Sequence, residues 1–235
     1  MSIHIANKMP PEDIGELVAD RFKSGERFVH LQDLSFHNLE ETARNDYIQR
    51  VSTAIGAVVL THPDDPGSGI WKLDSTTSPN LGSIPYHTDN PFYQEPEKIV
   101  AFWSVKSSAE GGENVILPAE DIFDRASSSQ QAAELIERLE STPMLFSHEQ
   151  YAATAPILGA EQGTVRFDRR FIGLEILDLA VRFDQLIRSE ELLGKAIKLK
   201  EGDALFFDNH RVLHAREPYQ NPDRVSYRVR INPDL

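Results

Sequence analysis

The stretch Tyr86–Phe92, with the sequence YHTDNPF, has the clearest potential for chemistry. His87 and Asp89 are two residues apart, and on an extended strand such residues point to the same face. An imidazole and a carboxylate would then be offered side by side to one point in space. Together with a distant histidine they would form the facial set of two histidines and one carboxylate that suits non-haem Fe(II) and leaves coordination positions open. The plainer interpretation is a polar strand end followed by a turn at Asn90 and Pro91.

Two histidines near the C-terminus are candidates for the third ligand. His210 and His214 are four residues apart, so on one strand they share a face, and alternation does not choose between them. A buried histidine with a single hydrogen bond is the commoner role for either one taken alone. Asp203 and Asp208, in the same segment, have a simple interpretation as turn residues. On the residues alone, the third ligand stays open between the two histidines.

A strand expected over residues 224–231 carries an unusual row of positive charge. Arg224, Arg228 and Arg230 share one of its faces, and apolar side chains alternate with them on the other. Arginine favours two-pronged bonds to carboxylate or sulfonate groups. The row indicates an anion pocket beside the metal, with a solvated edge strand as the alternative.

Composition limits the class of protein. The 235 residues are 40% hydrophobic and 26% charged, which suits one domain over residues 1–235 with an ordinary core. A net charge of −13 disfavours nucleic acid or an anionic membrane as a partner. The absence of cysteine excludes thiolate nucleophiles and cysteine-based zinc or iron–sulfur sites. We expect a cytoplasmic protein, because the sequence shows no signal-peptide pattern and no apolar run of the roughly 18 residues that span a bilayer.

The helices and strands that must position these residues are predicted from the spacing of apolar residues and from the glycine and proline residues that end each element. Helices over residues 10–23 and 39–55 form an N-terminal helical part that ends at about residue 56. The later segments alternate short strands with two further helices, and residues 57–61 are apolar on both faces, which predicts a central strand. Strands are expected over residues 28–31, 57–61, 98–105, 114–117, 143–146, 164–167, 195–199, 204–207, 211–216 and 224–231, and the two later helices over residues 127–139 and 175–193. This pattern predicts a mainly β protein with flanking α-helices, such as a jelly-roll barrel that holds a ligand in its mouth.

Taken together, these residues resemble the taurine dioxygenase family of Fe(II)/2-oxoglutarate oxygenases, including its clavaminate synthase-like relatives. The residues that carry the resemblance run in the family's order from about residue 85 to 231, and they are His87-Thr88-Asp89, Gly111-Gly112, Gly202-Asp203, Phe207-Asp208-Asn209, His214, Arg224 and Arg228. The resemblance implies a distorted double-stranded β-helix, a cupin-like jelly roll. It also implies that His214, rather than His210, is the third metal ligand.

The resemblance further implies a cosubstrate site and a reaction. Arg224 matches the arginine that binds the distal carboxylate of 2-oxoglutarate, and Arg228 matches a second arginine near the cosubstrate or an anionic substrate group. Asn114 stands where family members often carry threonine or serine to hold 2-oxoglutarate, and its amide can still donate a hydrogen bond. With Fe(II), 2-oxoglutarate and O₂, the implied reaction hydroxylates or desaturates an unactivated C–H bond and releases succinate and CO₂. Related halogenases lack the carboxylate that Asp89 provides, so its presence favours these outcomes over chlorination.

The substrate is less well defined. In similar enzymes the segment that matches residues 166–171, RFDRRF, comes near the active site. Asp168 is a candidate partner for a substrate amine, and Arg170 or Arg228 for a carboxylate, which would suit an amino acid or a similar zwitterion. In the alternative, Asp168 pairs with Arg166 or Arg170 at a strand end. Further candidates for the substrate-site wall are Trp71, Tyr86, Asn90, Phe92, Phe167, Arg169 and Phe171.

Two functions of other classes explain part of the pattern. A hydrolase could use zinc in the same triad, since three protein ligands and a water suit zinc, but this leaves Arg224 and Arg228 unexplained. A non-catalytic barrel that binds a small anion explains the arginines but not the three metal ligands. The sequence leaves open the oligomeric state, the position oxidised, and whether the substrate is free or tethered to a carrier.

Overall fold

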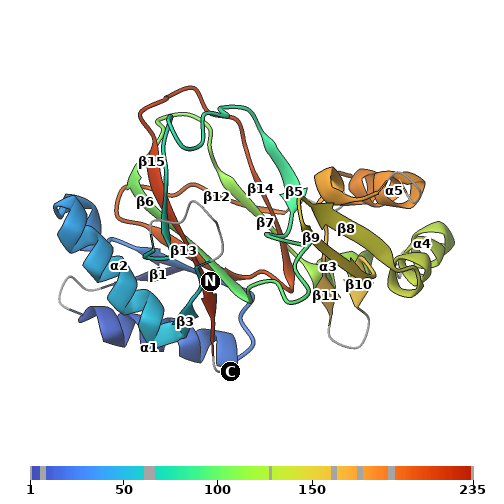
Figure 1. Ribbon diagram of the computed structural model, residues 1–235, viewed down its shortest axis with the longest axis horizontal. Coiled ribbons are helices and arrows are strands. Elements are labelled where there is room, and N and C mark those ends of the chain that lie inside the picture. Colours follow the sequence, from blue (N-terminus) through green and yellow to red (C-terminus); the bar gives the residue numbers. More distant parts are fainter. Residues whose placement is uncertain are drawn as a thin grey trace.

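Two β-sheets face one another at the centre of the computed structural model, which describes residues 2–5, 9–60, 67–126, 129–159, 163–173, 177–189 and 194–233 (Figure 1). The larger sheet contains β1 (Ser2–His4), β2 (Phe28–Gln32), β3 (Ala57–Val58), β4 (Ile70–Leu73), β6 (Ile99–Lys106), β13 (Ala204–Asp208) and β15 (Val225–Asn232). The smaller sheet contains β5 (Ile84–His87), β7 (Asn114–Pro118), β12 (Lys195–Ile197) and β14 (Val212–Arg216). The strand orders are β1-β2-β13-β6-β15-β3, with β4 also paired to β15, and β12-β7-β14-β5.

Two helices cover the outer face of the larger sheet. They are α1 (Pro11–Lys23) and α2 (Glu41–Ile55), which confirms the helices expected over residues 10–23 and 39–55. Ile14 and Val18 of α1 and Val51 of α2 are completely or almost completely buried in a cluster with the sheet. The two helices approach closely at Gly15, where a Cβ atom would collide with the backbone of α2. Apolar spacing on one helical face is therefore what attaches the N-terminal part to the core.

The central strands of the larger sheet divide their side chains between two environments. Tyr227 and Val229 of β15 point to the cluster under α1 and α2. Arg228 and Arg230 alternate with them and stand beside Phe102 and Val100 of β6, which belong to the cluster between the two sheets. Because β15 has strands on both sides, the interpretation of the arginine row as a solvated edge strand is wrong.

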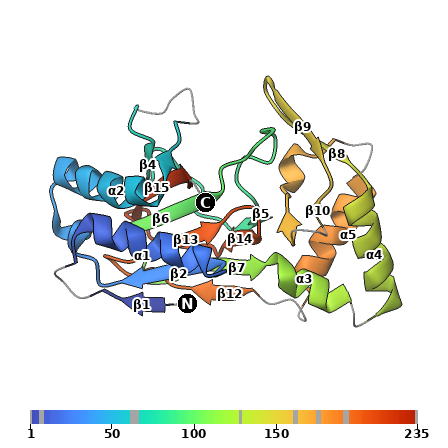
Figure 2. The ribbon, with the colours of Figure 1, turned by 90° about the horizontal axis from the view of Figure 1, so that it is seen from below.

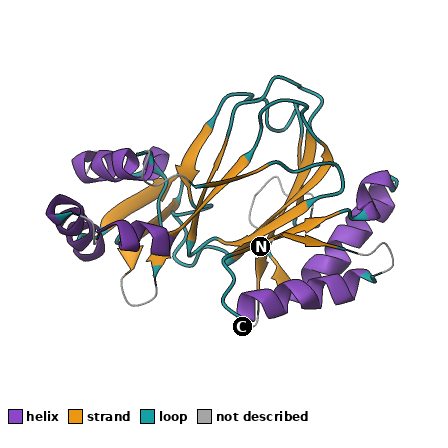
Figure 3. Cartoon of the chain, turned by 180° about the vertical axis from the view of Figure 1, so that it is seen from behind, coloured by secondary structure: helices purple, strands orange, loops and turns teal. Residues whose placement is uncertain are grey.

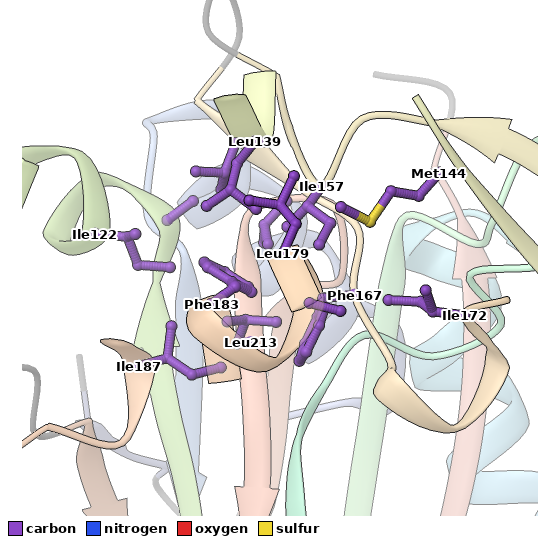
Figure 4. Close-up of a cluster of buried hydrophobic side chains, with 14 of the residues drawn as sticks. Ile122, Leu139, Met144, Ile157, Phe167, Ile172, Leu179, Phe183, Ile187 and Leu213 are labelled. Carbon is purple, nitrogen blue, oxygen red and sulfur yellow. The ribbon is translucent and has the colours of Figure 1, made fainter. Parts of the chain in front are cut away.

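A second group of helices and hairpins covers the opposite side, so that helices stand on both sides of the two sheets (Figures 2 and 3). It comprises α3 (Ala119–Ala126), α4 (Gln130–Ser141), α5 (Leu177–Ile187) and the hairpins formed by β8 (Met144–His148) with β9 (Tyr151–Ala155) and β10 (Leu158–Gly159) with β11 (Thr164–Val165). Leu139, Phe183 and Leu213 are among its fully buried residues, and Leu213 ties the group to β14 (Figure 4).

Several predicted elements differ from the structure. The prediction that residues 57–61 form a central strand is wrong. Leu60 is 59% exposed. Strand β3 has only two residues and lies at the edge of the sheet, where its pairing in the described part of the chain is to β15 alone. Its apolar residues reflect packing of Val58 against the cluster under α2 rather than burial on both faces. Strands β1, β4, β9 and β10 are not among the predicted strands. Residues 61, 127–128, 175–176 and 190–193 of the predicted elements lie outside the described residues.

None of the helices within the described ranges combines the length and the apolar character needed to cross a membrane.

The cluster under α1 and α2 gives a prediction for stability. Trp103 of β6 is fully buried, with ring centroids 5.2 Å from Phe36 and 5.3 Å from Phe206. Trp103→Ala should lower the free energy of unfolding by about 3–5 kcal/mol, because it leaves a large cavity. Urea unfolding followed by circular dichroism measures this. Leu145→Ala is the control, since Leu145 is 49% exposed, and a Trp103→Ala variant as stable as that control would contradict the assignment of this core.

Candidate metal centre and its two cavities

His87, Asp89 and His214 converge on one point between the two sheets. One ligand atom from each lies within 4.8 Å of the others, and this is the group of histidine and acidic side chains in the described residues that could hold a metal ion. The Oδ1 atom of Asp89 is 3.7 Å from Nε2 of His87 and 3.6 Å from Nε2 of His214. Adjacent ligands of an octahedral ion with bonds of about 2.1 Å stand about 3 Å apart, so a small inward shift would bring all three to one ion.

The two histidines are positioned by neighbouring antiparallel strands. His87, the last residue of β5, is paired in register with His214 of β14, and their ring centroids are 4.0 Å apart. Nδ1 of His87 donates to the carbonyl of Pro85 at 2.8 Å, which leaves Nε2 as the acceptor nitrogen facing Asp89. His210 lies in the turn after β13, and its ring donates to the carbonyl of Pro96 at 2.8 Å instead.

Asp89 reaches the same point by a different route from the one expected. Strand β5 ends at His87, so alternation along a strand does not aim the carboxylate. Asn209, directly after β13, holds the backbone of Asp89: its Oδ1 accepts the Asp89 N–H at 2.7 Å, and its Nδ2 donates to the Asp89 carbonyl at 3.1 Å and the Glu97 carbonyl at 3.0 Å. Asn209 is one of the residues that carry the family resemblance, but only the structure shows that its side chain holds the backbone of Asp89 in place.

Positive charge offsets the burial of Asp89. Burial would raise the pKa of Asp89, but Arg228, Arg230 and, to a smaller extent, the two imidazoles hold that pKa well below its ordinary value. Nη1 of Arg228 lies 3.4 Å from Oδ2 of Asp89, and Nη2 of Arg230 lies 3.0 Å from it. Burial, followed by the neighbouring His87, lowers the pKa of His214 well below the usual value, so its imidazole is neutral, which is the form that binds metals.

A cavity of about 90 Å³ lies on one side of the triad, against β14 and β7. Asn114, Arg224 and Arg228 line it, as does Arg216. Nδ2 of Asn114 and the Nε atoms of Arg216 and Arg228 are buried without a hydrogen-bond partner in the described structure. Burial lowers the pKa of Arg228 to about 10, and it also lowers the pKa of Arg224. A small cavity with unpaired buried donors fits a compact anion such as a dicarboxylate.

Arg216 was missed at the sequence level. It lies two residues after His214 on β14 and opposite Asn114 of β7, so the same alternation that aims His214 inward aims Arg216 inward. Its Nη2 atom donates to the carbonyls of Asn80 and Gly82 at 2.6 and 2.7 Å, which fixes the loop before β5 beside the cavity. The two-residue spacing from His214 could have predicted that the two side chains share a face of the strand.

A larger cavity of about 280 Å³ lies on the other side of the triad. The predicted substrate residues that line it are Asn90, Phe92, Asp168, Arg170, Phe171 and Arg228, and Arg230 lies beside them. Tyr93, His148, Glu149 and Tyr151, which the sequence did not single out, complete its wall. The two cavities share Ile84, His87, Asp89 and Arg228, so the triad stands at their junction.

Four of the proposed wall residues lie elsewhere. Phe167 is fully buried in the cluster around α5, and Arg169 pairs with Asp184 at 3.4 Å instead of lining the larger cavity. Tyr86 alternates with His87 and packs against the cluster around α5, with its hydroxyl near Gly194; burial raises its pKa. Trp71 lies on β4 beside Arg228 of β15 but is not part of the lining of either cavity. The expectation that Tyr86 and Trp71 contact substrate therefore does not agree with their positions, because Tyr86 packs against the apolar cluster and Trp71 is outside the lining of both cavities.

Asp168 and Arg170 form a pair, as in the alternative left open by the sequence. The Asp168 carboxylate is 97% buried and accepts bonds from Nε of Arg170 at 3.0 Å and from Nη2 at 2.6 Å. Arg166 donates instead to the carbonyls of Tyr93 and Gln94 at 3.2 and 3.1 Å. The side chain of Arg170 is 55% exposed, so the pair presents a guanidinium rather than a free carboxylate to the cavity.

Curated proteins resemble part of this chain in sequence. Trimethyllysine dioxygenase of Gallus gallus is 29% identical over 157 residues, which cover 57% of this chain and 37% of that protein, and the Mus musculus protein is also 29% identical over 157 residues, with 36% of its length covered. The chain thus spans little more than a third of these curated relatives.

Solved structures confirm the expected double-stranded β-helix fold. An asparagine oxygenase in complex with Fe(II), 2S,3S-3-hydroxyasparagine and succinate has a TM-score of 0.76 at 11% identity, with 98% of this chain and 93% of that chain covered. The non-haem iron oxygenase OrfP in complex with Fe and alpha-ketoglutaric acid has a TM-score of 0.74 at 15% identity, with 100% and 94% covered. The model of one family, taurine catabolism dioxygenase TauD, TfdA family, matches residues 24–230, and the chain belongs to this family.

Proposed function

We propose that the protein is a non-haem Fe(II)- and 2-oxoglutarate-dependent dioxygenase that hydroxylates or desaturates an unactivated C–H bond of a small metabolite. The observation that carries the proposal is the junction: His87, Asp89 and His214 stand between a small cavity lined by unpaired donors and a larger cavity open to a second molecule. A zinc hydrolase would not need the first cavity, and an anion-binding barrel would not need the triad. We further propose that it works in the cytoplasm, with which a chain without cysteine agrees.

The chemistry of each side chain suggests its proposed role. His87, Asp89 and His214 would hold the iron, which with O₂ as the oxidant would supply the chemistry that converts 2-oxoglutarate to succinate and CO₂ while one oxygen atom is left to oxidise the substrate. Arg224 and Arg228 would pair with carboxylates in the small cavity, and Asn114 would donate a hydrogen bond there. Because the two arginines are only partly exposed, water screens their charge less than it would screen a charge on the open surface.

We propose an amino acid or related zwitterion as the substrate. Arg170, oriented by Asp168, would pair with a substrate carboxylate, while Asn90 and the Phe92 ring form part of the wall. The carboxylate of Asp168 is occupied by Arg170, so its proposed role is orientation of the guanidinium. The names of similar proteins support this class, since they act on trimethyllysine or were crystallised with (3R,4R)-dihydroxy-L-Arg or hydroxyasparagine.

The metal centre gives the first functional prediction. Anaerobic addition of Fe(II) and then 2-oxoglutarate should produce a weak visible charge-transfer band, which neither zinc chemistry nor simple anion binding would give. Asp89→Ala should abolish this band and substrate oxidation, because it removes one of three ligands. Asp46→Ala, which changes an exposed acid on α2, should leave both unchanged. Undiminished turnover of Asp89→Ala would remove the triad from the mechanism.

The small cavity gives a prediction for cosubstrate affinity. Arg224→Gln should raise the Kd of 2-oxoglutarate by roughly 30-fold or more, since losing a buried charged partner costs about 2 kcal/mol or more. Titration of the charge-transfer band measures this Kd. Arg50→Gln, a change at an exposed arginine of α2, is the matched control. Equal affinities in the Arg224 and Arg50 variants would place 2-oxoglutarate elsewhere.

The larger cavity gives a separate prediction for the substrate. L-Amino acids and related zwitterions can be screened for substrate-dependent release of succinate. For the best substrate, Arg170→Gln should raise KM by about tenfold or more, the effect of losing a hydrogen bond between charged groups. The Kd of 2-oxoglutarate should not change, because Arg170 lines only the larger cavity of the two. A change in 2-oxoglutarate affinity with no change in KM would contradict this assignment.

A further inference from the structure

We infer that Asn90 accepts a hydrogen bond from the ammonium group of the substrate, and that Glu97 is a positioning residue that makes the amide oxygen of Asn90 available to the larger cavity. The inference rests on the proposed function and deepens it, because it names the group that recognises the positive end of a zwitterion. Asn90 lines the larger cavity and directly follows the proposed iron ligand Asp89. Glu97 is 2% exposed and is not part of the lining of either cavity at the triad.

The side chain of Asn90 is oriented by a partner on its nitrogen. Its Nδ2 atom donates to both carboxylate oxygens of Glu97, at 3.2 Å to Oε1 and 3.0 Å to Oε2. An ionised carboxylate only accepts hydrogen bonds, so it selects the amide nitrogen and excludes the flipped amide, in which oxygen would face oxygen. This leaves Oδ1 of Asn90, which is an acceptor, as the amide atom that can serve a molecule in the cavity.

The backbone on both sides of this pair is fixed. Asn90 has a φ of 52°, in the left-handed region that asparagine adopts more readily than most residues, and its carbonyl accepts the Tyr93 N–H at 3.1 Å. The carbonyl of Glu97 accepts from Nδ2 of Asn209 at 3.0 Å, and the same nitrogen donates to the carbonyl of Asp89. One side chain therefore fixes Glu97 relative to the proposed iron ligand.

The carboxylates that line the larger cavity are either occupied or exposed. Asp168 accepts bonds from Arg170 through both of its oxygens, and Oδ2 of Asp89 accepts from a guanidinium at 3.1 Å. Glu149 lies in the exposed turn between β8 and β9. Oδ1 of Asn90, by contrast, has no hydrogen-bond partner among the described residues and lies on the wall beside the triad. It is therefore the acceptor that fits an ammonium group bound next to the metal.

The buried carboxylate of Glu97 strengthens this acceptor. A carboxylate that accepts from an amide N–H polarises the amide, so the amide oxygen accepts more strongly. A cation in front of the amide and an anion behind it also attract each other, with less screening than at the surface. The cavity thus offers a guanidinium at Arg170 for the carboxylate of an amino acid and a polarised oxygen at Asn90 for its ammonium group.

The test compares the best amino-acid substrate from the screen with its deamino analogue, in which hydrogen replaces the ammonium group. The full chain is used with Fe(II) and 2-oxoglutarate, and succinate release gives the KM of the amino acid and the inhibition constant of the analogue. Asn90→Gly removes the amide and keeps a residue that tolerates positive φ. Glu97→Gln gives a side chain that no longer selects the amide nitrogen. Glu95→Gln changes an exposed acid outside both cavities and is the matched control.

Asn90→Gly should raise the KM of the amino acid about tenfold or more, the effect of losing a hydrogen bond to a charged group. The inhibition constant of the analogue should stay near its wild-type value, and so should the Kd of 2-oxoglutarate, because Asn90 does not line the small cavity. Glu97→Gln should raise the same KM by a smaller factor and add little in the Asn90→Gly background, since both changes act through one amide. Glu95→Gln should match the wild type.

Several results would overturn the inference. An unchanged KM in Asn90→Gly would remove the proposed acceptor. Equal losses for the amino acid and its analogue would show that Asn90 has a merely structural role. Fully additive effects of the Asn90 and Glu97 changes would show that Glu97 does not act through this amide.

Failure of the proposed function has a different signature. If the wild-type protein gives no charge-transfer band with Fe(II) and 2-oxoglutarate, the proposed function fails, and this inference fails with it. If the band forms but the wild-type protein prefers no substrate with an ammonium group over its deamino analogue, the inference alone is wrong.

Discussion

A carboxylate buried as deeply as that of Asp89 must be offset by positive charge and hydrogen bonds, because taking an ion out of water costs several kcal/mol. Arg228 and Arg230 supply that charge from β15, and Asn209 supplies the backbone bonds from the turn after β13. This need explains why a central strand in a protein of net charge −13 turns guanidinium groups inward. The same charged groups surround a site that could bind a metal ion next to an anion.

The surrounding fold holds that charged centre between two apolar layers. The larger sheet buries one face under α1 and α2, and a second cluster under α3, α4 and α5 anchors β14 through Leu213 (Figure 4). Between the sheets the side chains change from apolar, as at Phe207 and Val212, to polar, as at His214 and Arg228. Strands β5 and β14 then carry the histidines in register, so the metal centre inherits the rigidity of the sheet.

Much of the site could be predicted because successive side chains of a β-strand point to opposite faces of the sheet. The inward direction of Arg228 and Arg230 follows directly from their alternation with Tyr227 and Val229. The choice of His214 over His210 did not follow from alternation, since four residues preserve the face, and it came from the family resemblance. The structure supports that choice, because His210 is used in a turn.

Other features depend on contacts that no local pattern contains. Asp89 is aimed by Asn209, which lies 120 residues away, and not by the strand that precedes it. Tyr86 neighbours a ligand in the sequence but faces the opposite side of β5, and an apolar run at Ala57–Val58 proved to be an edge strand. The pairing of Asp168 with Arg170 was foreseen only as an alternative, because a carboxylate and a guanidinium two residues apart can bind each other or a ligand.

The central claim is that one metal ion sits at the junction of the two cavities and that the dicarboxylate occupies the smaller one. A crystal structure of the protein grown anaerobically with Fe(II) and 2-oxoglutarate tests it most directly, with anomalous scattering to locate the iron. We predict iron bonded to Nε2 of His87, Oδ1 of Asp89 and Nε2 of His214, with the distal carboxylate of 2-oxoglutarate at Arg224. Iron bound elsewhere, or 2-oxoglutarate in the cavity beside Arg170, would contradict the account.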